Sequence, residues 1–118
     1  MEKTSSQLSE HCKMSTIGIM DVQDIMGGKW KYLIITVLFF SGKLRFLDLK
    51  RQVNKIAPKV LSKELKDLEM NNLITRTVCN TKPITVEYEL TALGKSLNTV
   101  IEAMGNWGIN YRKSILKK

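Results

Sequence analysis

The sequence has few residues from which a metal site or a catalytic centre could be built. Its 118 residues include one histidine, His11, and two cysteines, Cys12 and Cys79. Because zinc sites draw their ligands mainly from cysteine and histidine, this set is too small for one. A glycine-rich phosphate loop and a Ser-His-acid set are also missing from the sequence. We therefore expect no enzyme, no metal site and no cofactor.

Long hydrophobic runs and an export signal are missing as well. The longest apolar run, Tyr32 to Phe40 with Thr36 inside it, is about half of the ~20 residues that a membrane-spanning helix needs. Residues 1–15 are serine-rich and mixed in charge, with no apolar signal core. We therefore expect a cytoplasmic protein without a membrane partner, in which both cysteines are free thiols.

The sequence is rich in positive charge. Nineteen Lys and Arg residues stand against 11 Asp and Glu residues, which gives a net charge of +8. The segment from Gly42 to Lys82 contains ten basic and four acidic residues, so six of the eight net charges lie in about a third of the chain. Clustered positive charge favours a polyanionic partner, because binding releases counterions from phosphates.

The spacing of hydrophobic residues predicts a mostly helical α+β domain over residues 14–118, preceded by a disordered or frayed arm over residues 1–13. Gly27-Gly28 separates the first two helices, and the turn Asn80–Pro83 joins two extended segments into a hairpin. This order is that of a winged helix-turn-helix with extra helices at both ends. We expect helices over 18–26, 29–40 (inward residues Trp30, Leu33, Ile34, Val37 and Leu38), 48–53, 58–71 and from Thr91 to Ile115, and strands over 44–46, 73–79 and 85–90.

The helix expected over 58–71 separates leucine from lysine. The leucines are Leu61, Leu65 and Leu68, which form an inward stripe. The opposite strip consists of Lys59, Ser62, Lys63 and Lys66. The major groove of B-DNA admits one α-helix, and such side chains can donate to phosphates and base edges. A solvated surface helix would show the same pattern, but the clustered charge favours contact with DNA.

The hairpin and the short strand before it add three more candidate DNA contacts. Lys82 lies in the turn, Arg76 lies on the strand leading to it, and Arg45 lies in the segment 44–46. In a wing, such residues reach the adjacent minor groove or backbone. The alternative is a hairpin that one lysine keeps soluble. The acidic residues Glu64, Asp67 and Glu69 are expected to be solvating or helix-pairing charges.

Five motifs follow one another along the chain: Met26–Lys31, Leu44–Phe46, Leu61–Glu69, Val86–Thr91 with Gly94, and Asn106–Gly108. Taken together in this order, they resemble the HxlR-type regulators, a branch of the MarR-like winged helix group. The resemblance covers about residues 12–112 and implies a homodimeric transcription regulator, such as a repressor, that binds a roughly palindromic double-stranded operator. The helix from Pro58 would enter the major groove and the hairpin would be the wing.

Two positions depart from the family pattern. Family members usually have serine or threonine where this chain has Leu47, and serine where it has Ala57. Both positions would be helix N-caps, each worth about 1 kcal/mol. Without these capping hydroxyls, both helix starts are expected to be less stable, and position 57 is not expected to contact a phosphate through its side chain.

The terminal helices are expected to form a two-fold dimer interface. Its candidate residues are Ile19, Val22, Met104, Trp107, Tyr111 and Ile115. In the alternative interpretation, the last helix packs back onto its own domain. A winged helix that binds another protein instead of DNA is the rival function, although such a module does not require the clustered charge.

The resemblance also raises the question of an effector. Several HxlR-type regulators resemble redox or electrophile sensors with a reactive cysteine near Cys12, usually followed by proline, whereas Lys13 follows here. Cys12 is therefore either a redox sensor or an idle thiol, and Cys79 is interpreted as a packing residue. A small-molecule cavity is a second hypothesis, with core packing as the alternative. Its candidate residues are Met26, Trp30, Met104 and Trp107.

Overall fold

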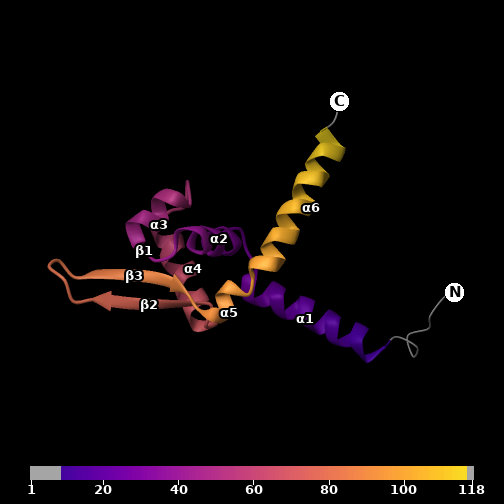
Figure 1. Ribbon diagram of the computed structural model, residues 1–118, viewed down its shortest axis with the longest axis horizontal. Helices are drawn as coiled ribbons and strands as arrows, with labels where there is room; N and C mark the ends of the chain where they lie inside the picture. Colours follow the sequence, from indigo (N-terminus) through magenta and orange to yellow (C-terminus); the bar gives the residue numbers. More distant parts are fainter. Residues whose placement is uncertain (1–8, 117–118) are drawn as a thin grey trace.

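The computed structural model describes residues 9–116. Figure 1 shows the hairpin at one end, packed helices in the middle, and the first and last helices extending away from the body in different directions. The expected α+β architecture, mostly helical with a hairpin wing, is confirmed. The elements are α1 (Glu10–Met26), α2 (Lys31–Ser41), β1 (Leu44–Arg45), α3 (Phe46–Gln52), α4 (Pro58–Met70), β2 (Ile74–Cys79), β3 (Thr85–Leu90), α5 (Ala92–Lys95) and α6 (Asn98–Leu116).

The core lies between α2, α3, α4 and one face of a three-stranded antiparallel sheet with the order β1-β3-β2. The leucine stripe of α4 is buried as expected, and Tyr88 and Leu90 of β3 are buried opposite it. Burial of such side chains supplies most of the free energy of folding. No helix within residues 9–116 is long and apolar enough to cross a membrane.

Helix α1 is longer than the sequence indicated. It begins at Glu10, because Ser9 Oγ accepts a hydrogen bond from the Cys12 backbone N–H at 3.2 Å and caps the first turn. Positions 10–13 of the expected frayed arm are therefore helical, and residues 1–8 lie outside the described residues. The sequence indicates a helix only from Gly18 onward, because the regularly spaced apolar residues Ile19, Val22, Ile25 and Met26 begin there.

The buried face of α2 also differs from the expectation. Leu33 was expected to point inward but is 49% exposed, whereas Ile35 is fully buried beside Ile34 and Leu38. Nearly every residue of α2 is apolar, so hydrophobic spacing alone does not fix its orientation. Its orientation is set by its neighbours, because α2 contacts α3, β3 and α6.

A tight corner connects α4 to the wing. Asn72 has a left-handed φ of 63°, and the Leu73 backbone N–H donates to the Leu68 carbonyl oxygen at 3.0 Å. These are features of a Schellman helix end. Thr91 Oγ1 donates to the Asn72 carbonyl oxygen at 2.7 Å and accepts from the Gly94 backbone N–H at 3.0 Å. The corner thus fixes the start of β2 against the end of β3 and the start of α5.

The single C-terminal helix expected from Thr91 is in fact two helices. Thr91 caps α5 as expected, but α5 is a short segment ending at Lys95. Helix α6 starts at Asn98 in a new direction (Figure 1). Leu93 was expected to belong to the apolar stripe of one long helix, and it is 57% exposed.

Candidate nucleic-acid interface

Helix α4 presents a basic ridge to solvent, on the side opposite its leucine stripe. We call Lys59, Ser62, Lys63 and Lys66 the α4 ridge; all four residues are exposed. Pro58 occupies the first turn, where a proline costs no backbone hydrogen bond. Ala57 stands at the N-cap and makes no side-chain capping bond, so the helix start lacks this stabilisation.

The ridge continues into a hollow between α4 and the wing. Ser62 and Lys66 line this hollow together with Arg76 of β2, beside Glu69 and Tyr88. Strand register explains the meeting, because Arg76 pairs with Tyr88 and therefore lies on the same face of the sheet as this buried tyrosine. The structure thus brings three of the sequence-predicted residues to one place.

Arg45 and Lys82 lie elsewhere. Arg45 pairs with Glu87 of β3, which places it on the opposite face of the sheet from Arg76. It lines a separate hollow with residues of α3 and with Ile84 near the turn. Lys82 is exposed in the turn at the far end of the hairpin. Neither residue lines the hollow that Ser62, Lys66 and Arg76 share.

A buried ion pair beneath α4 was missed by the sequence analysis. Lys31 Nζ donates to Glu64 Oε1 at 2.5 Å and lies 3.4 Å from Asp67 Oδ2. Glu64 is only 7% exposed, so its interpretation as a solvating charge is wrong. Its position three residues after Leu61, on the flank of the leucine stripe, was the available signal.

The same contacts determine the protonation of Lys31. Desolvation by burial lowers the pKa of Lys31, but the hydrogen bonds and negative charges of Glu64 and Asp67 outweigh it and raise the pKa overall. Lys31 is therefore a fixed positive charge at neutral pH. It stands at the start of α2, three residues after the Gly27-Gly28 break.

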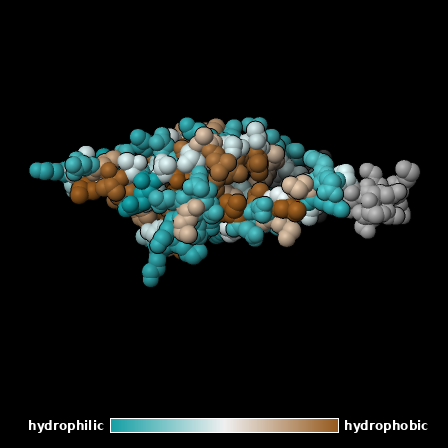
Figure 2. All heavy atoms as spheres, turned by 90° about the horizontal axis from the view of Figure 1, so that it is seen from below, coloured by the Kyte–Doolittle hydropathy of each residue, from teal (hydrophilic) through white to brown (hydrophobic). Residues whose placement is uncertain are grey.

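The residues expected at a dimer interface lie on the two projecting helices. Five are exposed, and Val22 is half-buried against the core. No described residue of α6 is buried, and the rings of Trp107 and Tyr111 stack with centroids 5.2 Å apart. Figure 2 shows hydrophobic atoms at the surface in the half of the molecule where α1 runs toward the grey N-terminal residues. Both helices therefore have apolar surface that their own domain does not cover.

The two cysteines occupy different environments. Cys12 is exposed in the first turn of α1, and Cys79 is half-buried at the end of β2. Both are free thiols. Cys79 is thus part of the wing, whereas Cys12 lies on one of the projecting helices.

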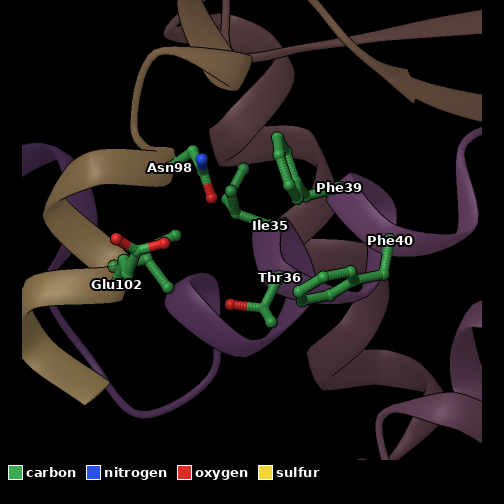
Figure 3. A pocket seen from close by; sticks show the side chains of 7 residues that line it. Ile35, Thr36, Phe39, Phe40, Asn98 and Glu102 are labelled. Carbon is green, nitrogen blue, oxygen red and sulfur yellow. The ribbon is translucent and has the colours of Figure 1, made fainter. Parts of the chain in front are cut away.

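Core packing, the favoured interpretation of the four cavity candidates, applies to Met26 and Trp30, whereas Met104 and Trp107 are exposed on α6. Met26 belongs to the core, while Trp107 is 68% exposed on α6, beyond the body. A pocket of about 160 Å³ lies instead between α2 and α6. Figure 3 shows Phe39 and Phe40 on its α2 side and Asn98 and Glu102 on its α6 side.

Comparison with known proteins agrees with this architecture. The HTH-type transcriptional regulator YtcD of Bacillus subtilis (strain 168) is 37% identical over 99 residues, which is 84% of this chain and 78% of YtcD. A crystal structure of YtcD aligns with a TM-score of 0.73 and 38% identity, covering 79% of this chain and 94% of that one.

Two regulators with described redox states are also similar. The reduced form of the redox regulator HypR aligns with a TM-score of 0.76 and 30% identity, over 86% of this chain and 99% of HypR. The reduced form of the transcriptional regulator YodB from B. subtilis aligns with a TM-score of 0.66 and 28% identity, over 92% of this chain and 94% of YodB. The model of the HxlR-like helix-turn-helix family matches residues 25–115. The chain therefore belongs to the HxlR-like helix-turn-helix family of transcriptional regulators.

Proposed function

We propose that this regulator binds double-stranded DNA sequence-specifically as a homodimer, with α4 in the major groove and the β2–β3 wing on the adjacent minor groove or backbone. The observation that supports this most directly is the α4 ridge, which is exposed along the helix while the leucine stripe is buried. A helix oriented in this way fits a major groove, and its lysines are donors for phosphates and base edges.

Most of the basic residues that we propose as DNA contacts have no acidic partner in the described part of the chain that would compete with phosphate. Among residues 9–116, no carboxylate lies within 4.0 Å of Lys59, Lys66, Arg76 or Lys82. Lys63 makes an exposed ion pair with Asp67, 3.6 Å between Nζ and Oδ2. Such surface pairs are worth ~1 kcal/mol or less, so a phosphate can compete for Lys63. Arg45 and Lys82 would contact the backbone on either flank.

Replacing Lys59 and Lys63 together by alanine is expected to weaken duplex binding by about tenfold or more. Two phosphate contacts would be lost, so the slope of log affinity against log salt should fall by about 2. Fluorescence anisotropy with a labelled operator duplex, repeated over a series of salt concentrations, measures both quantities.

The matched control removes two lysines away from the ridge. Lys95 on α5 and Lys113 on α6 are exposed, and replacing both by alanine changes the net charge by the same amount. If both double variants lose affinity equally, the α4 ridge is not the DNA-binding face. If the wild-type protein shows no salt-dependent binding to any duplex, the rival function, a winged helix that docks another protein, is favoured.

The main support for the proposed dimer is the exposure of α6 in the single chain. An isolated helix is only marginally stable in water, and yet none of the described residues of this 19-residue helix is buried. A second copy that covers its apolar residues, together with those of α1, would supply the missing packing. Two α4 ridges about one DNA turn apart, ~34 Å, could then contact successive major grooves.

Replacing Trp107 and Tyr111 together by serine is expected to weaken dimerisation by about thirtyfold or more, the effect of losing one aromatic hot spot. The core should remain folded because both side chains are exposed in the single chain. Sedimentation equilibrium measures the dissociation constant, and Asn110→Ser, an exposed position on the same helix, is the control. A wild-type protein that stays monomeric at high concentration would contradict the dimer.

We further propose that an oxidant or a small electrophile acts through Cys12. Its exposure on a projecting helix allows access to the thiol, and the similar regulator HypR has been solved in oxidised and reduced forms. DNA binding before and after diamide treatment tests this role, since Cys12→Ser should abolish any response.

A further inference from the structure

The charges of α4 do not by themselves favour DNA. Its three lysines are matched by three acidic residues, Glu64, Asp67 and Glu69. Of these, Asp67 lies close enough to hold one lysine of the α4 ridge, with 3.6 Å between its Oδ2 and Lys63 Nζ, whereas no carboxylate among residues 9–116 lies within 4.0 Å of Lys59 or Lys66. Lys63 is therefore the ridge lysine whose availability to phosphate depends on whether another cation also pairs with Asp67.

Lys31 of α2 contacts two of these carboxylates. It contacts Glu64 in a buried position and also contacts Oδ2 of Asp67, the same oxygen that lies 3.6 Å from Lys63 Nζ. Asp67 Oδ2 therefore contacts two cations, the buried Lys31 and the exposed Lys63. The Lys31 side chain is about 10% exposed, whereas the Lys63 side chain is 75% exposed.

We propose that Lys31 is a positioning residue for DNA binding: by occupying Glu64 and Asp67 beneath α4, it leaves Lys63 available to a phosphate. The inference rests on the proposed DNA-binding function of the α4 ridge. Without Lys31, Asp67 would have Lys63 as its remaining cation and would hold it along the helix. The repulsion between Lys31 and Lys63 would also disappear, so Lys63 would leave Asp67 less readily.

The test uses a variant that should fold and keeps the net charge unchanged. Lys31→Met together with Glu64→Leu removes one positive and one negative charge and leaves no buried charge unpaired. We expect its affinity for the operator duplex to fall about fivefold, and its salt slope to fall by about 1, because the Lys63 contact with phosphate is lost. Circular dichroism and thermal melting establish that both proteins are folded under the assay conditions.

Two further variants separate positioning from a purely structural role. Adding Asp67→Asn to the double variant should restore affinity and slope, because Lys63 is released although the buried pair is still missing. Lys31→Arg should bind as the wild type does. If the folded double variant binds with wild-type affinity and slope, or if Asp67→Asn does not restore its binding, the inference is overturned. Failure of the wild-type protein to bind duplex would instead refute the proposed function.

Discussion

Replacing Lys31 alone by methionine is expected to lower the free energy of unfolding by about 3–5 kcal/mol. The substitution leaves the Glu64 carboxylate in the core without its cation, since Glu64 is only 7% exposed and Lys31 is its ion-pair partner within residues 9–116. An unpaired buried charge is among the few single changes that cost this much. Urea denaturation followed by circular dichroism measures the loss.

The control is again the Lys31→Met, Glu64→Leu double variant. Removing both charges exchanges a desolvated ion pair for apolar packing, so the unfolding free energy should return to the wild-type value or exceed it. Lys31→Met, Glu64→Leu and the double variant form a double-mutant cycle that yields the coupling energy between the two side chains. A loss in the double variant equal to the sum of the single losses would show that the two side chains are not coupled.

The stabilisation by Lys31 also has a predictable dependence on pH. Its folded-state pKa is raised, so its contribution to stability is complete below the ordinary lysine pKa and is lost only as the pH rises through the raised value. The difference in stability between the wild-type protein and Lys31→Met should therefore not depend on Lys31 titration near neutral pH. It should shrink in strongly alkaline buffer.

Sequence reasoning predicted α4 well because this helix alternates between strongly apolar and strongly polar side chains. The stripe of Leu61, Leu65 and Leu68 admits one orientation, and the exposed position of the ridge follows from it. The hairpin was equally clear, since Tyr88 and Leu90 alternate with glutamates along β3. Local patterns were sufficient wherever the two faces of an element differ in polarity.

The remaining features depend on contacts between distant residues. Lys31 and Glu64 are 33 residues apart, and nothing in the spacing of either helix indicates that they meet. Strand register places Arg76 in the same hollow as Lys66 and puts Arg45 on the opposite face of the sheet. The sequence of a single strand does not encode this register. For α2, almost uniform hydrophobicity removed the polar side that would have fixed its buried face.

Replacing Gly94 by alanine is expected to destabilise the protein by about 3 kcal/mol. An added Cβ would lie 2.1 Å from the Leu73 carbonyl oxygen and 3.3 Å from Leu90 Cδ2. The carbonyl is backbone and also accepts from the Thr91 N–H at 3.0 Å, so it has little freedom to withdraw. Relief would require α5 to move away from the α4–β2 corner, which breaks the Thr91 contacts.

The control for this prediction is Gly105→Ala in α6. Nothing lies within 4 Å of a Cβ built at Gly105, and alanine in a helix interior is favoured over glycine by about 0.5–1 kcal/mol. The two substitutions are chemically identical and should change the melting temperature in opposite directions. Because α6 begins three residues after the end of α5, Gly94→Ala should also weaken dimerisation. A loss of unfolding free energy below ~1 kcal/mol for Gly94→Ala would mean that the corner is looser than its contacts indicate.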